Sequence, residues 1–339
     1  MSISFFFDKI VSLIGTLNNP AFFLYRVCHY LNKDVPYGVA KYLCKRNIKD
    51  YQKNGFNDFV IETYDGSGQA VHPDIAYLNN CYWMVLTPYP YGMEEYENPC
   101  VYQGNSLDSL KVPEGPITCQ KKHMPGIHLS DPCFAKNGDR LFCYYRESER
   151  KGIHEDQKIW EMQFVDKTNA WLKPRLLMSS SVDKILSPAM LFNDEGDLDI
   201  FYVSTLNNKF TLVCESLNQN GKKLYYPFIE YLPKDYDLWH IGISKMTEID
   251  DSCHNSKMLA GLFLMRSKLK SGGMKLLETS SDNWGKDWHV TKEVMMPPSL
   301  QGEVQFPYKS CFIPKGKGSI LLSFRDKKSR NRLIIINQN

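Results

Sequence analysis

Two aspartates carry the strongest indication of chemistry in this sequence. Asp74 lies in the run HPDI and Asp131 lies in the run SDP, 57 residues further along the chain. Two carboxyl groups in one pocket could hydrolyse a glycosidic bond, since one can activate water or attack the sugar while another protonates the leaving oxygen. For one aspartate alone, a turn cap is the simpler interpretation. Because two aspartates occupy matching places in a repeat, catalysis and turn capping are equal alternatives for them.

The repeat extends beyond these two residues. Ser187 follows Asp131 after 56 residues and His240 follows Ser187 after 53. Each unit has a short polar motif, an apolar strand, a tight turn, a strand of aromatic and β-branched residues, and then a third strand. Five such units of about 55 residues fill residues 57–339.

Five units of this kind predict an all-β fold, a five-bladed β-propeller preceded by a short helical segment. A two-sheet sandwich would not explain why polar residues recur at strand starts. The innermost strands of a propeller surround a central channel, and their starts line one mouth of it. We therefore expect the following residues to converge there: Asp74, Asp131, Ser187, His240 and either Lys309 or Ser310.

The first 52 residues differ from the rest in the spacing of their apolar residues. Apolar residues recur at helical spacing over residues 6–17, and further helices are expected over 21–31 and after Pro36. The last of these carries Lys41, Lys45 and Arg46. A basic, aromatic-rich helical segment can lie on an anionic membrane surface. The alternative is a helical cap that packs on the main domain or on another subunit.

Composition excludes several classes of function. The net charge of +3 gives no reason to expect nucleic acid as a partner. The sequence contains no long uncharged apolar stretch, so we expect no transmembrane helix. The N-terminus lacks the features of a secretory signal, so we do not expect one. The ten cysteines form no CxxC pair, and the eight histidines show no metal-ligand spacing. We expect free thiols in a cytoplasmic protein, or one at the inner face of a membrane, with neither metal nor cofactor.

These motifs also resemble a known group. HPDI, SDP and the five-unit count are similar to the five-bladed glycoside hydrolase propellers of the arabinanase, β-xylosidase and invertase type. The likeness is closer to uncharacterised bacterial and phage members of that superfamily, and it covers residues 60–339. The matching residues are Trp83, Thr87, Pro88, Tyr89, Pro90, Glu97, Asn98, Pro99, Trp239 and His240.

The resemblance implies roles for particular residues. Asp74 matches the base or nucleophile of the first blade, and Asp131 matches the aspartate that tunes its partner's pKa or stabilises the transition state. The sequence departs from the family in the third blade, where Ser187 stands in place of the acidic proton donor. Glu97 or Glu303 could supply that proton instead, because each lies close in sequence to an innermost strand.

Further residues suit a sugar or an acidic sugar. Arg146, Arg266 and Arg325 stand at similar places in three blades and could bind carboxylate or phosphate. The alternative for each is an ion pair at a strand end. His240 could add a hydrogen bond or act as an acid. Some aromatic residues could stack on sugar rings while the others pack in the core; the candidates are Trp83, Tyr89, Tyr91, Tyr96 and Trp239.

Two functions from different classes follow. The first is a glycosidase-like or phosphorylase-like enzyme that acts on a bacterial surface glycan or its precursor, with Asp74 as base or nucleophile and Asp131 as electrostatic partner. The second is a propeller without catalysis that binds or scaffolds glycan in polysaccharide assembly. Both predict carbohydrate as the partner and leave a homo-oligomer open.

Overall fold

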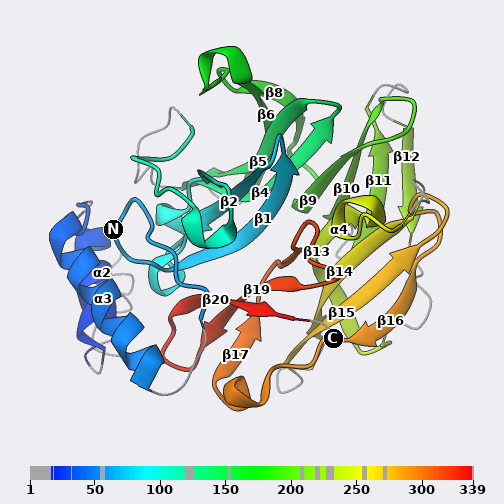
Figure 1. Cartoon of the computed structure of the whole chain (residues 1–339). Coiled ribbons are helices and arrows are strands. Elements are labelled where there is room, and N and C mark those ends of the chain that lie inside the picture. The colour runs from blue at the N-terminus through cyan, green and yellow to red at the C-terminus, as the bar shows by residue number, and fades with distance from the viewer. Residues whose placement is uncertain are drawn as a thin grey trace.

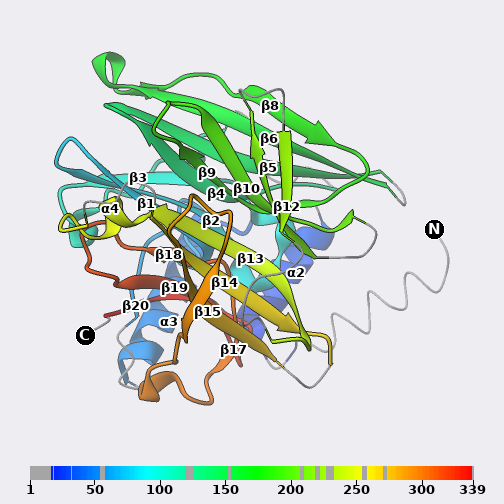
Figure 2. The ribbon, with the colours of Figure 1, turned by 90° about the vertical axis from the view of Figure 1, so that its right-hand side faces the viewer.

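Five antiparallel sheets follow one another along the chain and surround a common centre (Figure 1). The structure is a computed structural model that describes residues 17, 19–31, 33–53, 58–118, 126–151, 154–206, 210–217, 222–226, 233–253, 258–269 and 273–337. In the side view, the green sheet of residues 127–180 lies at the top (Figure 2). The predicted five-bladed β-propeller is confirmed.

Each blade is built from neighbouring strands in chain order. Blade 1 contains β1 (Ala70–Leu78), β2 (Cys81–Pro88) and β3 (Cys100–Gly104). Blade 2 contains β4 (Ile127–Asn137), β5 (Arg140–Lys151), β6 (His154–Val165), β7 (Ala170–Trp171) and β8 (Arg175–Ser180). Blade 3 contains β9 (Ile185–Phe192), β10 (Leu198–Ser204), β11 (Thr211–Ser216) and β12 (Lys222–Tyr226).

The last two blades follow the same plan with one variation. Blade 4 contains β13 (Tyr236–Lys245), β14 (Leu259–Ser267), β15 (Met274–Ser281) and β16 (His289–Glu293), and the short helix α4 (Met246–Ile249) follows β13. Blade 5 contains β17 (Val304–Pro307), β18 (Cys311–Phe312), β19 (Ile320–Asp326) and β20 (Asn331–Ile336). Both β17 and β18 pair with β19, so the innermost strand of blade 5 is interrupted at residues 308–310.

Apolar side chains hold the blades together. Strand β10, LDIFYVS, is buried along its whole length, as expected for a β-branched and aromatic run covered on both faces. Phe201 of blade 3 packs with Phe263 of blade 4 in one of the interblade cores. Separate clusters join blades 4 and 5, 5 and 1, 1 and 2, and 2 and 3. The ring of blades is therefore closed by five hydrophobic interfaces.

The two ends of the propeller chain meet in blade 5. Asp58 forms a β-bridge with Ile334, and Phe59 donates its N–H to the Leu333 carbonyl at 2.9 Å. Arg332 Nε donates to Asp58 Oδ2 at 2.6 Å, and both side chains are almost fully buried. Residues from before blade 1 thus complete the outer edge of the last blade.

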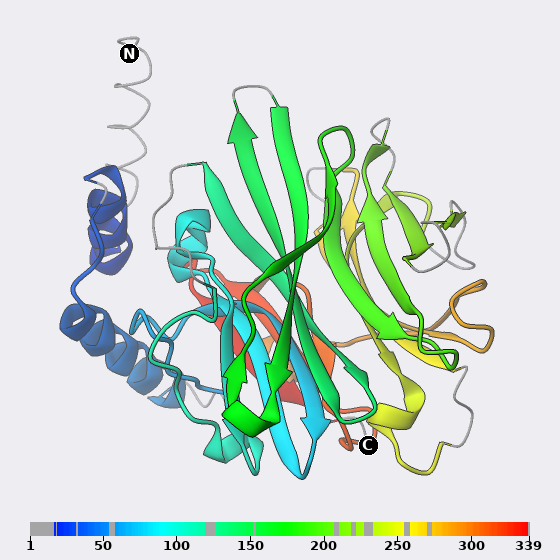
Figure 3. The ribbon, with the colours of Figure 1, turned by 90° about the horizontal axis from the view of Figure 1, so that it is seen from above.

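Helices α2 (Pro20–Tyr30) and α3 (Tyr37–Lys53) lie outside the ring, beside blades 1 and 5 (Figures 1 and 3). Phe22 of α2 stacks on Tyr91, with ring centroids 5.3 Å apart, and Asp50 of α3 pairs with Arg330 at 3.0 Å. The helix predicted over residues 6–17 lies outside the described residues except at its last position. Within the described part of the chain, no helix has the length and apolarity needed to cross a bilayer.

Candidate functional site

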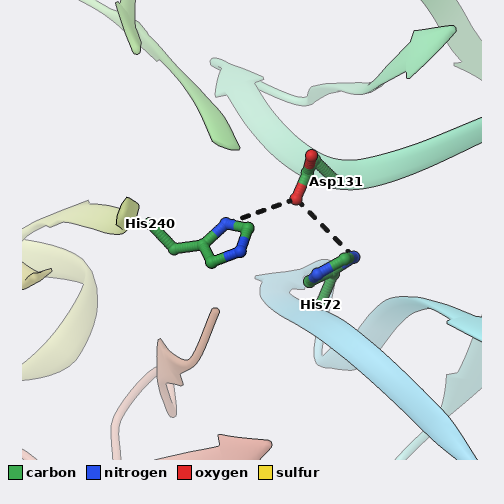
Figure 4. Close-up of side chains that lie close together, drawn as sticks. All are labelled: His72, Asp131 and His240. Atoms are coloured by element: carbon green, nitrogen blue, oxygen red, sulfur yellow. Dashed lines mark ion pairs between the residues drawn. The ribbon is translucent and has the colours of Figure 1, made fainter. Parts of the chain in front are cut away.

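Three polar side chains converge where the innermost strands of blades 1, 2 and 4 approach one another (Figure 4). Nδ1 of His72 on β1 lies 3.6 Å from Oδ1 of Asp131 on β4, and Nδ1 of His240 on β13 lies 3.7 Å from the same oxygen. All three residues are buried; Asp131 has no exposed surface. Both imidazoles therefore face one carboxylate oxygen.

A repeated backbone feature directs His72 and Asp131 toward the axis. His72, Asp131 and Ser187 have φ angles of 54°, 50° and 51°, and each precedes a proline. At each place the register with the neighbouring strand shifts, so the innermost strand bulges. A bulge with a left-handed residue re-aims a side chain out of the regular alternation.

This feature corrects the alignment of the repeats. The matching residues of blades 1, 2 and 3 are His72, Asp131 and Ser187, because the prolines that follow them lie at equivalent places. The sequence alignment that matched Asp74 with Asp131 was displaced by two residues.

Asp131 is held as a carboxylate. Arg146 donates to Asp131 Oδ2 across 2.9 Å, while Oδ1 has no hydrogen-bond partner. Burial alone would raise the pKa of Asp131, but the surrounding His72, Arg146, His240 and Lys309 lower it far below its usual range. The negative charge of Asp131 is therefore present throughout the neutral and mildly acidic range.

The two histidines are held neutral. Burial lowers the pKa of His72 to about 4 and that of His240 to about 3. The charge of Asp131 opposes this effect, and the positive charges of Arg146 and Lys309 add to it. Nδ1 of each ring is buried without a hydrogen-bond partner. Each ring can therefore offer a lone pair at the centre of the site.

Glu97 completes the group, which we call the axial cluster (His72, Glu97, Asp131 and His240). Its Oε1 lies 3.8 Å from His72 Nδ1. It follows the turn Glu94–Tyr96, whose Tyr96 packs against Tyr25 of α2. Burial, and next the charge of Asp131, raise the pKa of Glu97 well above its usual range. A neutral carboxylic acid thus lies beside an ionised carboxylate.

Lys309 bridges the channel next to the axial cluster. It lies between β17 and β18, and its Nζ donates to the carbonyls of Pro132 and Pro188 at 3.1 and 3.0 Å. Its side chain is almost fully buried. These carbonyls belong to the prolines of the blade 2 and blade 3 bulges, so blade 5 is tied to the same level of the axis.

Asp74 occupies a different environment. Its Oδ2 accepts the N–H of Phe134 at 2.7 Å, which links blade 1 to blade 2. It lines a cavity on the axis together with Cys133, Lys309 and Cys311. Burial raises its pKa to about 6. No hydrogen bond or ion pair between Asp74 and Asp131 occurs among the described residues.

Several predicted binding residues have structural contacts. Ser187 Oγ donates to the Ile241 carbonyl at 2.8 Å and accepts the Ile241 N–H at 3.0 Å, so it links blades 3 and 4. Arg146 faces Asp131, Ser130 and Gln157. Trp83 is buried against Phe164 in the core between blades 1 and 2.

Other predicted residues lie nearer the surface. Arg266 stacks over Trp239, with its guanidinium carbon 3.7 Å from the ring centroid. Arg325 donates to the Tyr91 carbonyl at 3.4 Å. Tyr89 is half-buried, and its ring contacts Tyr308, whose ring in turn meets the edge of His72. These aromatic rings extend from the axial cluster toward blade 5.

Glu303 lies in the turn before β17. Within the described chain, none of the residues of the axial cluster forms a hydrogen bond or ion pair with its side chain. Of the two candidate proton donors, Glu97 is the one beside the cluster.

The sequence analysis did not identify His72 as a candidate. It also did not identify the group of metal-binding side chains that His72 forms with Asp131 and His240. His72, Asp131 and His240 offer two imidazole nitrogens and one carboxylate oxygen within 4.8 Å of one another. The sequence predicted no such group because the ligands come from three blades and have no local spacing. Aligning the units on Pro73, Pro132 and Pro188 would have brought out His72.

The fold is similar to those of several carbohydrate-active proteins. No family model and no curated protein matches the sequence. An N-acetylgalactosamine deacetylase from F. plautii, in complex with blood group B trisaccharide, matches with a TM-score of 0.59 and 16% identity over 79% of this chain and 88% of that one. A thermostable family-43 glycoside hydrolase matches with a TM-score of 0.56 and 9% identity over 79% and 88%.

An exo-1,5-α-L-arabinanase from a bovine ruminal metagenomic library gives a TM-score of 0.53 and 11% identity over 80% of this chain and 93% of that one. The chain is therefore a five-bladed β-propeller that structurally matches family-43 glycoside hydrolases at low identity. The resemblance predicted from HPDI and SDP is confirmed at the level of the fold.

Proposed function

We propose that this protein is a hydrolase that acts on a glycan and cleaves a glycosidic bond at the axial cluster. The observation that carries the proposal is the placement of two carboxyl groups, Glu97 and Asp131, beside the same imidazole nitrogen at the axis. Glu97 Oε1 and Asp131 Oδ1 lie 3.8 and 3.6 Å from His72 Nδ1. Glycosidic hydrolysis uses one carboxyl group as an acid and another, in its ionised form, as the base that activates water or as the nucleophile.

The environments of the two groups support different roles. Glu97 is buried beside another acid, which favours the protonated form, so it is the donor for the leaving oxygen. Asp131 is bound by Arg146 through Oδ2 and stays ionised, so its Oδ1 is the group that attacks the anomeric carbon or takes the proton of the attacking water. This assignment keeps Glu97, one of the two predicted candidates for the proton donor, and gives Asp131 the role of base or nucleophile that the resemblance implied for Asp74.

A bacterial surface glycan or its precursor is the substrate class that we propose. Structurally similar proteins include one in complex with blood group B trisaccharide and a β-1,3-galactosidase with galactodeoxynojirimycin. The half-buried Trp239 contacts the His240 ring, and the half-buried Tyr89 contacts Tyr308, which lies against His72. Such rings suit the apolar faces of sugars.

The test measures release of reducing sugar from a panel of bacterial surface polysaccharides by the full-length protein. Glu97→Gln is isosteric and removes the proton, so we expect kcat to fall by about 10²-fold or more. The matched control Glu303→Gln makes the same change in a turn before β17, and we expect kcat to stay within about threefold.

Two outcomes contradict this assignment. Loss of turnover in Asp74→Asn with full activity in Glu97→Gln would restore the roles implied by the family resemblance. Tight glycan binding without any product, in a correctly folded wild-type protein, would favour the non-catalytic binding function instead.

A second reaction on the same substrate class is removal of an acyl substituent from a sugar. The observation that favours it is the pair of imidazoles around Asp131, which a mechanism with two carboxyl groups does not require. One structurally similar protein is an N-acetylgalactosamine deacetylase. Measuring acetate beside reducing sugar in the same assay separates the two reactions.

A further inference from the structure

Three buried atoms at the propeller axis lack hydrogen-bond partners, and all three face one another. They are Nδ1 of His72, Nδ1 of His240 and Oδ1 of Asp131. The exposed fractions of these residues are 5%, 8% and 0%, so bulk water does not solvate them freely. Burying a polar atom without a hydrogen-bond partner is unfavourable. Three such atoms around one point indicate a missing common partner.

The spacing of these atoms fits a single ion. The oxygen lies 3.6 and 3.7 Å from the two nitrogens, and all three atoms lie within 4.8 Å of one another. These distances are too long for hydrogen bonds between the imidazoles and the carboxylate. Ligand atoms that bind a tetrahedral ion at about 2.1 Å lie roughly 3.4 Å apart. The two nitrogen–oxygen distances are within a few tenths of an ångström of that spacing, and the two nitrogens lie no more than 4.8 Å apart.

The side chains are held in place by their neighbours. Arg146 binds Asp131 Oδ2 at 2.9 Å and leaves Oδ1 directed at the histidines. The His72 ring meets Tyr308 edge-on at 6.0 Å, and the His240 ring meets Trp239 edge-on at 5.8 Å. The two imidazole rings lie 5.3 Å apart. Preorganised ligands lose little conformational entropy when they bind an ion.

From this geometry we propose that His72, Asp131 and His240 bind one divalent transition-metal ion through Nδ1, Oδ1 and Nδ1. Two imidazoles and one carboxylate suit zinc, cobalt, manganese or iron better than calcium or magnesium, which prefer oxygen ligands throughout. Three protein ligands leave at least one coordination position for water or a substrate oxygen.

Positive charge near the site opposes binding and limits affinity. Arg146 lies beside Asp131, and the Lys309 ammonium group is bound between two carbonyls close by. Glu97 lies 3.8 Å from His72 and is the other carboxyl group beside the proposed ligands. The net effect favours exchangeable binding of the ion over permanent retention.

The ion would also change the roles within the axial cluster; this step rests on the proposed function. With an ion bound, Asp131 would serve as a ligand, and the ion would supply Lewis acidity toward a substrate or water oxygen. Glu97 is then the carboxyl group of the cluster that remains available to exchange a proton with the substrate.

The experiment uses full-length protein treated with a chelator, desalted and titrated with cobalt(II) alone. We expect uptake of one equivalent, measured by calorimetry and by visible absorption typical of four- or five-coordinate cobalt. His72→Ala, His240→Ala and Asp131→Asn should each weaken binding by at least about tenfold. The matched control is His289→Ala, since His289 is an exposed histidine on β16, and its affinity should equal that of wild type.

Three results would overturn the proposal. The first is uptake below one-tenth of an equivalent by the wild-type protein for cobalt, zinc and manganese alike. The second is thiolate-to-cobalt absorption, which would assign the ion to cysteines. The third is undiminished affinity in the folded ligand variants.

A crystal of wild-type protein grown with cobalt decides the question if the variants fail to fold. An anomalous peak between His72, Asp131 and His240 supports the site, and a peak elsewhere or none refutes it. Because these measurements contain no glycan, their failure is distinguishable from failure of the proposed function. Glycan turnover that persists in a chelator, with no ion bound, would leave the hydrolase proposal standing and remove the metal.

Discussion

His72 and Asp131 occupy the same place in successive blades, and their side chains meet across the propeller axis. Each is a left-handed residue before a proline, at the bulge of an innermost strand, and His72 Nδ1 lies 3.6 Å from Asp131 Oδ1. The same bulged backbone conformation, repeated in successive blades, therefore places chemically different side chains at one point. Rotational repetition converts places far apart in the sequence into neighbours.

Ser187 lies at the equivalent bulge of blade 3 and has an uncharged side chain. Its hydroxyl both donates to the carbonyl and accepts from the N–H of Ile241. Ser187→Ala leaves two buried backbone groups without a partner, so we expect the free energy of unfolding to fall by about 2 kcal/mol or more. Urea unfolding measures this change. The matched control Ser179→Ala, at an exposed position of β8, should change it by less than about 0.5 kcal/mol. Equal effects of the two substitutions would contradict the linking role.

Closure of the ring depends on the buried pair Arg332–Asp58. Removing one member of a buried ion pair leaves the other charge desolvated, so Arg332→Ala should lower the free energy of unfolding by about 3–5 kcal/mol. The matched control is Lys275→Ala, because Lys275 pairs with Glu293 at 2.8 Å where both side chains are exposed. That change should cost less than about 1 kcal/mol. Similar melting temperatures for the two variants would show that residues 58–59 are dispensable for closure.

Glu155 predicts a dependence of stability on pH. Burial alone would raise its pKa, but hydrogen bonds from Lys184 and Ser148 outweigh that effect and lower it to about 2. A carboxyl group with a lowered folded-state pKa stabilises the fold above its unfolded pKa of about 4.5, and this contribution is lost as the pH falls toward 2.

We therefore expect Glu155→Gln to be less stable than wild type at pH 6 and to approach it between pH 5 and 2. Chemical unfolding at several pH values measures the difference. Lys184→Met removes the partner and should weaken the same pH dependence. A difference between wild type and Glu155→Gln that stays constant with pH would exclude this linkage.

A peripheral contact with an anionic membrane through the N-terminal segment remains our proposal for location. Helix α3 carries Lys45 and Arg46 beside Tyr42, whose side chain is 64% exposed. Full-length protein should float with anionic vesicles, less so as salt rises, because exposed charge interactions are screened. The double variant Tyr42→Ser/Lys45→Glu should reduce flotation, whereas Lys286→Glu, in the loop before β16, should not. Equal flotation with neutral vesicles, or none at low salt, would count against the membrane.

Local patterns predicted most of the fold. The strand–turn–strand units can be recognised from runs such as LDIFYVS and from turns such as Asn137-Gly138. This is possible because strand pairing in a hairpin involves residues close in sequence. The five-unit count then leaves few architectures. Asp131 and His240 were recognised for the same reason, since each begins a unit.

The sequence alone determined the number of blades, the strand starts and the residue types available at them. Only the tertiary structure decided that His72 rather than Asp74 matches Asp131, because a bulge shifts the register by a residue that composition does not reveal. It also placed Glu97, which reaches the axis because its loop packs against α2. Contacts between distant segments depend on how five blades close on one another, and that closure results from packing over the whole chain.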